Sequence, residues 1–227
     1  MSLSKDNRKC FTGDMSLITW EAAVRLWPLP NSTSDKYSRG VVGLDTGSGH
    51  YPGAALLGCA GALHSGAGMV RYVGAAPGEL ILSRYPSVVV GQGRVQSLVI
   101  GSGWGDDDQA TRFASALERG VPLVVDADAL RQLPADLPAN SLLTPHAGEL
   151  ARLLGVERGA VEADPRGHAL RAANQFGVTV LLKGGAQFVA TSGGDVRIPV
   201  QGPAWTAQAG SGDVLAGVCG TLLAAGL

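Results

Sequence analysis

The chain has 227 residues, and its 18 Lys and Arg against 19 Asp and Glu give a net charge of -1. This balance argues against a protein that binds nucleic acid, because such binding depends on an excess of cations. The 33 glycines are about twice the usual share of roughly 7%, which indicates many tight turns in a globular chain. The late apolar run Val214 to Leu227 is shorter than the roughly 20 residues of a transmembrane helix, so no membrane association is expected.

The three cysteines, Cys10, Cys59 and Cys219, are far apart and contain no CxxC pair. They therefore predict neither a disulfide framework nor a zinc motif. The charged residues at the N-terminus are not followed by the apolar stretch of a signal peptide. We expect a soluble protein of a reducing, cytoplasmic compartment.

Residues 1–36 are predicted to be an N-terminal appendage to one domain, residues 37–227. Within the appendage, Thr19–Trp27 can form a short helix that Pro28 and Pro30 end. Near the other end, Gln187–Ala190 and Val196–Val200 flank turn residues, which predicts a hairpin on a sheet edge.

Between these segments, short apolar runs alternate with helix signals. This pattern is typical of a mostly parallel sheet covered by helices on both faces. The expected strands are Val41–Leu44, Met69–Val73, Val88–Val90, Leu98–Ile100, Leu123–Val125, Ser141–Leu143 and Thr179–Leu182. The expected helices are Gly53–Leu63, Asp108–Arg119, Ala147–Leu154, Pro165–Phe176 with Asp164 as N-cap, and a last helix from Asp213.

Ligands of parallel sheets bind outside the carboxyl ends of the strands, so the residues that follow each apolar run are candidates for a site. We expect these segments to line one cleft. They are Gly47–Gly49, Gly101–Gly105, Asp126–Asp128, Thr144–His146, Lys183–Gly185 and, before the last helix, Ala209–Asp213.

The segment Gly210-Ser211-Gly212-Asp213 is the clearest of these motifs. Glycines at a helix start let backbone N–H groups converge on an anion, which the positive end of the helix also favours. A carboxylate in the same turn can accept a proton from a hydroxyl during phosphoryl transfer. The alternative is that the glycines only shape a turn and that Asp213 only caps the helix.

The other motifs leave more than one interpretation open. Gly47 to Gly53 is one residue too long for GxGxxG, and Arg71 stands where an acidic ribose ligand is expected, so a dinucleotide fold is disfavoured. Asp126 and Asp128 could hold a metal through waters or cap a helix. His146 is either a ligand or a hydrogen-bonding residue of the fold. Lys183 either meets a nucleotide phosphate or extends its amine to solvent at an edge.

Several strings, taken in order, resemble the NAD(P)H-hydrate dehydratases, a branch of the ribokinase-like superfamily. The resemblance runs from about Lys36 to the C-terminus. GxGD is shared across the superfamily, whereas YPGAA, TPHxGE and DADAL are specific to the dehydratases. The strings are GSGHYPGAALLGCAGALHSGAGMVRYVG, IGSGWG, PLVVDADAL, LLTPHAGELARLLG, VLLKGG and AGSGDVLAG.

The resemblance implies a ribokinase-like three-layer α/β/α fold and an ADP- or ATP-dependent lyase. Such an enzyme phosphorylates the ring hydroxyl of hydrated NADH or NADPH and eliminates phosphate, which restores the cofactor. Mg²⁺ is expected with the phosphates. The resemblance also implies a homo-oligomer, a tetramer, and a separate NAD(P)H-hydrate epimerase.

The implied residue roles follow the motifs. Asp213 is the base, and Gly210, Ser211 and Gly212 form the anion hole. The hydrated substrate would contact Ala54, Gly103, His146 and Asp213. The adenine nucleotide would contact Lys183, Gly184, Gly185, Ala186, Gln187 and Gly212.

The chain departs from the family in the segment Gln201–Gln208, which replaces a Gly-Asn-rich approach, and at Ser102 and Trp104, where Pro and Leu are commoner. Relatives also continue beyond the position of Leu227, so the domain is expected to be incomplete there. Two other functions stay open: a ribokinase-like kinase of a vitamin precursor or sugar, and a non-catalytic nucleotide-binding protein.

Overall fold

A ten-stranded sheet organises the chain, which the computed structural model describes over residues 17–106 and 108–227. Cys10 and the charged N-terminal residues lie outside these ranges. The strand order is β1-β10-β9-β8-β7-β6-β5-β2-β3-β4. Neighbours are parallel except for the two pairs that involve β9. The strands are β1 (Leu17–Ile18), β2 (Val41–Asp45), β3 (Met69–Tyr72), β4 (Val89–Val90), β5 (Ser97–Ile100), β6 (Leu123–Val125), β7 (Leu142–Leu143), β8 (Thr179–Leu182), β9 (Phe188–Ala190) and β10 (Val196–Pro199).

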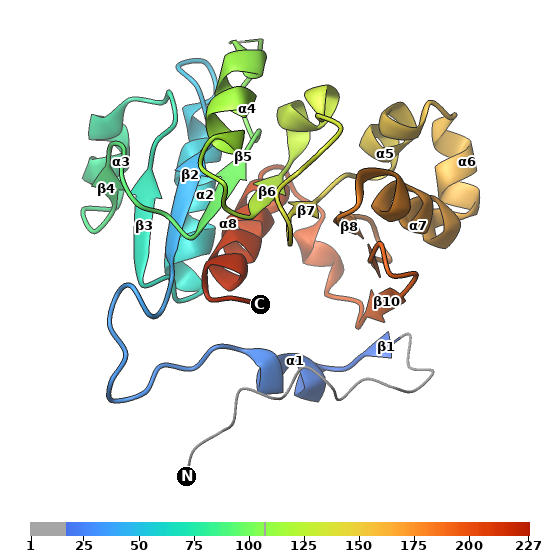
Figure 1. Cartoon of the computed structure of the whole chain (residues 1–227), viewed down its shortest axis with the longest axis horizontal. Helices are drawn as coiled ribbons and strands as arrows, with labels where there is room; N and C mark the ends of the chain where they lie inside the picture. Colours follow the sequence, from blue (N-terminus) through green and yellow to red (C-terminus); the bar gives the residue numbers. More distant parts are fainter. Residues whose placement is uncertain (1–16, 107) are drawn as a thin grey trace.

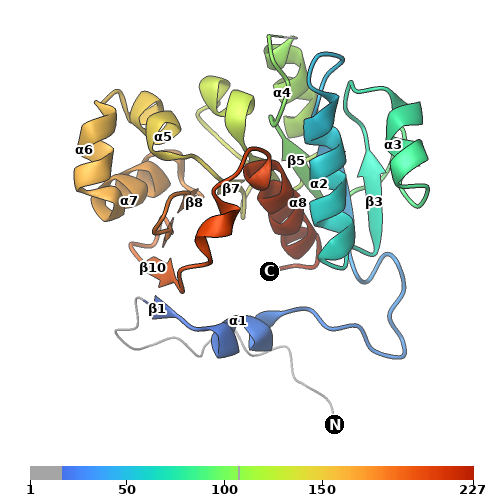
Figure 2. The same cartoon turned by 180° about the vertical axis from the view of Figure 1, so that it is seen from behind.

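Helices cover both faces of this sheet (Figures 1 and 2). Figure 2 shows α2 and α8 together in front of the central strands. The helices are α1 (Trp20–Leu26), α2 (Pro52–His64), α3 (Gly78–Arg84), α4 (Gln109–Leu117), α5 (Ala147–Leu154), α6 (Arg158–Ala163), α7 (Pro165–Phe176) and α8 (Ser211–Ala224), with 3-10 turns η2 (Ala127–Gln132) and η3 (Ala204–Thr206).

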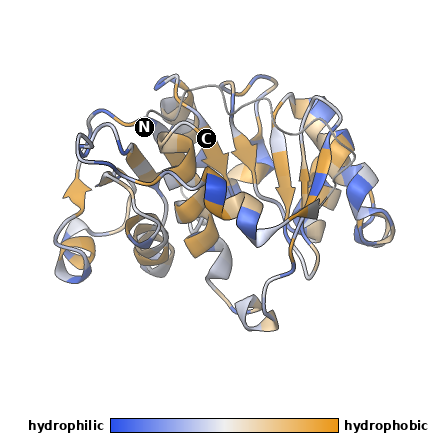
Figure 3. Cartoon of the chain, turned by 90° about the horizontal axis from the view of Figure 1, so that it is seen from below, coloured by the Kyte–Doolittle hydropathy of each residue, from blue (hydrophilic) through white to orange (hydrophobic). Residues whose placement is uncertain are grey.

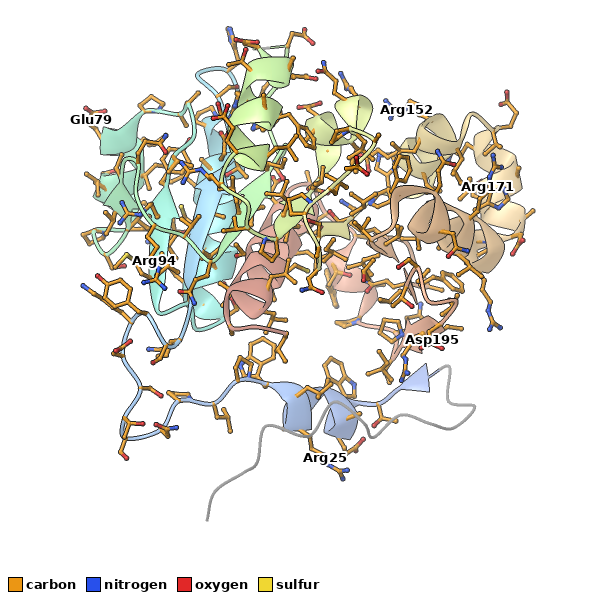
Figure 4. The ribbon with its side chains drawn as sticks, viewed as in Figure 1. Arg25, Glu79, Arg94, Arg152, Arg171 and Asp195 are labelled. Carbon is orange, nitrogen blue, oxygen red and sulfur yellow. The ribbon has the colours of Figure 1, made fainter. Side chains whose placement is uncertain are left out.

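Alternate residues of the central strands enter two different cores. Leu98 and Ile100 of β5 pack with the helices α4, α5 and α7, whereas Val99 between them packs with α2 and α8. Successive side chains of a strand point to opposite faces, so a strand covered on both faces must be apolar throughout. This explains why the strands read as continuous apolar runs, and Figure 3 shows them as orange ribbons inside the molecule. Charged residues such as Glu79, Arg171 and Asp195 lie on the outside (Figure 4).

Glycines bring α2 and α8 into close contact. A Cβ at Gly61 of α2 would overlap the backbone oxygen of Val214, and one at Gly217 of α8 would overlap that of Gly58. Only residues without a side chain allow two helix backbones to approach this closely. The two helices therefore pack along their backbones, which holds them tightly against each other.

The strand order reverses between β2 and β5. From β2 the chain continues outward to β3 and β4 on one side, and from β5 to β6, β7 and β8 on the other. Loops that leave such a pair of strands diverge, which opens a crevice at the carboxyl edge of the sheet. The segments Gly47–Gly49 and Gly101–Gly105 follow these two strands and therefore border the crevice.

The N-terminal segment runs along the lower side of the domain in Figure 1. Its strand β1 pairs in parallel with β10, Leu17 opposite Ile198, and so extends the sheet beyond the hairpin. Helix α1 is capped by Thr19, whose side chain accepts a hydrogen bond from the N–H of Ala22. Thus two residues of the predicted appendage belong to the sheet.

The predicted fold class is confirmed: the sheet is mostly parallel, lies between two helical layers and ends in the hairpin β9–β10. Each predicted strand and helix is present, with ends that differ by at most two residues. Asp164 caps α7 as expected, through Gly167 N–H. Strand β1 and helices α3 and α6 were not predicted from the sequence. These elements are short, and α3 and α6 each bury a single residue.

No helix in the described ranges is long and apolar enough to cross a membrane. Cys59 and Cys219 are free thiols.

Helix α8 is buried on one side only. Some of its apolar residues, such as Val218 and Leu222, are half-buried. The apolar side chains of this helix are therefore only partly covered by the described part of the chain.

The contact between α2 and α8 can be tested with an added methyl group. Gly217→Ala places its Cβ 2.9 Å from the Ala62 nitrogen, so we expect the free energy of unfolding to fall by about 1–3 kcal/mol. Gly159→Ala in α6, where a Cβ meets nothing within 4 Å, is the control and should be neutral or slightly stabilising. Chemical denaturation of both variants measures the difference; equal stabilities would contradict the close contact.

Candidate functional site

The loops at the crevice between β2 and β5 are joined backbone to backbone. The N–H of Gly47 donates a hydrogen bond to the carbonyl of Ser102 at 2.7 Å. Gly103 has a φ of +66° and lies so close to α2 that a Cβ there would be 2.6 Å from the Ala54 Cβ. The structure thus brings the predicted substrate residues Ala54 and Gly103 together. Beside them is a cavity of about 410 Å³, lined by Ser48, His50, Tyr51, Gly103–Asp106, Asp128 and Arg131.

A buried carboxylate lies at the end of the next strand. Asp126, only 2% exposed, follows β6 and accepts three side-chain hydrogen bonds. Ser102 Oγ donates to its Oδ2 at 2.9 Å, Thr144 Oγ1 to its Oδ1 at 2.8 Å, and Lys183 Nζ to the same Oδ1 at 2.6 Å. These partners come from the ends of β5, β7 and β8. Asp126 therefore gathers polar groups from three neighbouring strand ends.

For Asp126 the capping interpretation is wrong, whereas the binding of a metal through waters stays a prediction. Its side chain does not cap the η2 turn that follows. Among the described residues, no group of three or more His, Cys, Asp or Glu side chains is placed to hold a metal ion. Asp128 instead accepts a hydrogen bond from the N–H of Gly105 at 2.9 Å. The partners of Asp126 were missed in the sequence because hydrogen bonds between strand ends do not show in a single chain segment.

Lys183 reaches the start of the last helix. Its amine, held by Asp126, is 3.3 Å from where a Cβ at Gly212 would be, and Asp126 Oδ2 is 4.0 Å from the same point. Any side chain at Gly212 would fill this space. The Lys183 side chain is 19% exposed, and its amine points inward, so the expectation of an edge lysine extended to solvent is wrong.

Asp213 lies in the first turn of α8, but it does not cap the helix. The N-cap is Gly210, with a φ of +86° and no side-chain hydrogen bond. Burial raises the pKa of the Asp213 carboxyl, and the neighbouring Asp126 carboxylate raises this pKa further. Lys183 and the nearby Ser102 hydroxyl lower the same pKa. The helix dipole alone predicts a lowered pKa, so burial and the second carboxylate dominate here.

His146 follows β7 and forms the N-cap of α5. Its Nδ1 accepts hydrogen bonds from the N–H groups of Gly148 and Glu149 at 3.0 and 3.1 Å. The backbone N–H of His146 in turn donates a hydrogen bond to the Glu149 carboxylate at 2.8 Å, which completes a capping box. The imidazole is 54% exposed, and its Nε2 lies 3.5 Å from Glu149 Oε1. The structural interpretation of His146 is therefore correct, and the exposed ring edge leaves room for a ligand contact.

A second cavity of about 600 Å³ lies beyond the ends of β7 and β8. A bridge pairs His146 with Lys183, whose N–H donates to the Pro145 carbonyl at 2.8 Å. Of the predicted nucleotide residues, Lys183, Gly184, Gly185 and Ala186 line this cavity, with His146, whereas Gln187 and Gly212 do not. This cavity and the cavity of about 410 Å³ have no lining residue in common.

The mostly parallel sheet between two helical layers is a ribokinase-like fold. In agreement, a ribokinase-like superfamily protein from Enterococcus faecalis superposes with a TM-score of 0.79 at 22% identity, over 92% of this chain and 81% of that one. The family model for NAD(P)H-hydrate dehydratase matches residues 42–227. The chain therefore belongs to the NAD(P)H-hydrate dehydratase family.

The names of individual relatives are consistent with membership of this family. A bifunctional NAD(P)H-hydrate repair enzyme of Mycobacterium leprae is 46% identical over 213 residues, 88% of this chain but 44% of that protein. This chain thus spans less than half the length of that relative. An ADP-dependent (S)-NAD(P)H-hydrate dehydratase of Xanthomonas campestris is 35% identical over 95% of this chain and 83% of its own. The ADP/ATP-dependent NAD(P)H-hydrate dehydratase structure from Bacillus subtilis superposes with a TM-score of 0.81 at 25% identity, over 90% and 83% of the two chains.

The capping role of His146 can be separated from a contact with substrate. His146→Ala removes the cap of α5 and should lower the free energy of unfolding by about 1 kcal/mol, whereas His146→Asn keeps a capping oxygen and most of the stability. Thermal unfolding measures this part. If the exposed ring edge also contacts a substrate, the KM rises in both variants. Equal stabilities of the two variants would show that the cap does not stabilise α5.

Proposed function

We propose that this chain catalyses the nucleotide-dependent dehydration of hydrated NADH or NADPH. The observation that carries this proposal is the turn Gly210–Asp213, in which Gly212 lies beside the Lys183 amine and the Asp213 carboxyl interacts electrostatically with Lys183 and Asp126. Anion-binding groups beside a carboxylate are what transfer of a phosphoryl group to a hydroxyl requires. The names of the relatives support hydrated NAD(P)H as the substrate.

In this mechanism the Asp213 carboxylate accepts the proton of the ring hydroxyl. The hydroxyl oxygen forms a bond to the terminal phosphorus of the nucleotide as the bond from that phosphorus to the bridging oxygen breaks. The substrate then loses phosphate from the ring and a proton from the adjacent carbon, which restores the dihydronicotinamide double bond. Phosphorylation is needed because hydroxide is a poor leaving group. The proton from carbon leaves to water, and the net reaction converts the hydrate and ATP, or ADP, into NAD(P)H, phosphate, a proton and ADP, or AMP.

The neighbours of Asp213 suit its proposed role as a base. Its burial and the Asp126 carboxylate raise its pKa, which strengthens it as a proton acceptor while the carboxylate is ionised. Lys183 supplies a positive charge opposite the glycine turn, where negative charge on the transferred phosphoryl group would lie. Asp126 holds this lysine in place. The chain thus combines a base and an anion site within a few residues.

The nucleotide is proposed to lie along the cavity beyond β7 and β8, where Lys183–Ala186 supply backbone groups and one charge. Mg²⁺ would arrive with the phosphates, because this ion keeps several waters and needs only one or two carboxylates from the protein. Asp126 and Asp213 are carboxylates of the kind it prefers. When bound, the ion neutralises phosphate charge.

The proposed assembly is a homo-oligomer, a tetramer as the resemblance implies, and the half-buried apolar residues Val218 and Leu222 of α8 support it. An NAD(P)H-hydrate epimerase is the proposed partner enzyme, on a separate chain or joined to this one. The names of the longer relatives as bifunctional repair enzymes support this pairing.

The role of Asp213 can be tested by replacing its carboxylate with an amide. Asp213→Asn keeps nearly the same size, and α8 does not depend on this side chain for its cap, so the fold should persist. Without a proton acceptor we expect turnover to fall by about 10²–10⁴-fold. Recovery of NADH absorbance from acid-hydrated NADH, with ADP or ATP, measures turnover, and nucleotide titration should show near wild-type affinity.

The outcomes of this assay also distinguish the other functions. A stable phosphorylated product from the wild-type protein would indicate a small-molecule kinase, and binding of nucleotide without any reaction would indicate a non-catalytic protein. An Asp213→Asn variant that turns over within a few-fold of wild type would show that another group is the base.

The raised pKa of Asp213 predicts opposite effects of pH on activity and on stability. Turnover needs the ionised carboxylate, so it should fall with decreasing pH, with a midpoint above the ordinary aspartate value of about 3.9. The folded state favours the protonated form, so the contribution of this group to stability is present at low pH and is lost as pH rises through the folded pKa. We therefore expect Asp213→Asn to match wild-type Tm near pH 4 and to exceed it near pH 8. A lower Tm than wild type near pH 8 would contradict this assignment.

A further inference from the structure

An arginine of α4 lies against both loops of the crevice between β2 and β5. The Arg112 guanidinium forms an ion pair with the Asp45 carboxylate at the end of β2. Its Nη2 also donates to the carbonyl of Gly47 at 3.2 Å, and its Cζ lies 4.5 Å from the centroid of the Trp104 ring. One side chain thus contacts the end of β2, the loop that follows it and the loop that follows β5.

Trp104 completes the contact between these loops. Its ring is fully buried, and its Nε1 donates to the backbone carbonyl of Asp45 at 2.7 Å. Asp45, Arg112 and Trp104 therefore form a closed set of contacts, called here the Asp45–Arg112–Trp104 unit. Gly47 is fixed by both of its backbone groups, since its N–H bonds to Ser102 and its carbonyl to Arg112.

Stability alone does not explain this unit. A buried ion pair is often no more stabilising than apolar residues of the same volume, because both charges must leave water. Arg112 Nη1 is buried and makes no hydrogen bond to the described part of the chain, which adds a further cost. Burial also raises the pKa of the Asp45 carboxyl in spite of the arginine beside it. What the guanidinium supplies that an apolar side chain cannot is a fixed, planar set of donors.

We propose that Arg112 is a positioning residue that holds the segments Gly47–Gly49 and Gly101–Gly105 in the shape that receives the hydrated nicotinamide substrate. Its side chain does not line the cavity of about 410 Å³, whereas Ser48, Gly103 and Gly105 of these segments do. The arginine therefore acts through the loops rather than by touching the substrate. This proposal rests on the proposed function and adds a residue that sets substrate affinity.

The test separates substrate affinity from turnover and from nucleotide binding. In Arg112→Met we expect the KM for hydrated NADH to rise by about tenfold, the value of a lost hydrogen bond to a charged group, with kcat nearly unchanged. The affinity for ADP or ATP should remain within about twofold, because the second cavity shares no lining residue with this one. Arg112→Lys should recover only part of the KM, since a lysine cannot pair with Asp45, reach Gly47 and stack on Trp104 together.

Two controls keep the result interpretable. Arg119→Met, just after the same helix, removes an arginine that bonds to the Gly93 carbonyl at 3.2 Å and should leave the KM unchanged. If Arg112→Met fails to fold because Asp45 is left as an unpaired buried charge, Asp45→Asn with Arg112→Met removes both charges and should show the same rise in KM.

Trp104 provides a readout that does not depend on activity. It is the one fully buried tryptophan of the four, since Trp20, Trp27 and Trp205 are 64%, 40% and 89% exposed. Acrylamide quenching should show one protected tryptophan in the wild type and in Arg119→Met, and partial loss of that protection in Arg112→Met.

An unchanged KM in a folded Arg112 variant would overturn the proposal, and so would an equal loss of substrate and nucleotide affinity, which would indicate a general structural role. If the wild-type protein does not restore NADH at all, the proposed function fails. The quenching experiment would then still show whether Arg112 holds these loops.

Discussion

The carboxylate of Asp126 connects four strand ends at the centre of the site. It follows β6 and accepts hydrogen bonds from Ser102 after β5, Thr144 after β7 and Lys183 after β8. A buried carboxylate without these partners would be strongly destabilising, so the strands and the charge depend on each other. The geometry of the proposed phosphoryl site follows from this carboxylate, because it determines where the Lys183 amine lies and contributes to the raised pKa of Asp213.

The alternation of strands and helices could be predicted from the sequence because a sheet covered on both faces requires uninterrupted apolar strands. Strand β6 is an example, since all three residues of Leu123–Val125 are apolar and buried. The short elements β1 and α6 lack this signal: β1 has two residues, and α6 buries only Val161. The position of β1 depends instead on a contact with a distant segment, as the pairing of Leu17 with Ile198 shows.

The candidate site was predicted in part for the same reason. Residues after strands meet at one edge, so Asp126, His146 and Lys183 could be singled out from their place in the sequence. Their hydrogen-bond partners could not be predicted, because Lys183 and Asp126 are 57 residues apart in the sequence. Whether an aspartate caps a helix, binds a metal or forms an ion pair depends here on that distant lysine. The upward shift of the Asp213 pKa could not be predicted from the sequence either, since it depends on burial and on the carboxylate of Asp126 at the end of another strand.

The glycine contacts between α2 and α8 have a consequence for how the site can move. Helix α2 begins beside the loop after β2, and α8 begins at the Gly210 turn. Because Gly61 and Gly217 allow the two backbones to touch, the helix pair acts as a fixed spacer between the proposed substrate loop and the proposed phosphoryl loop. Adjustment to different nucleotides is therefore left to the opposite side of the site, where Gly184–Ala186 are exposed and lie outside this helix pair.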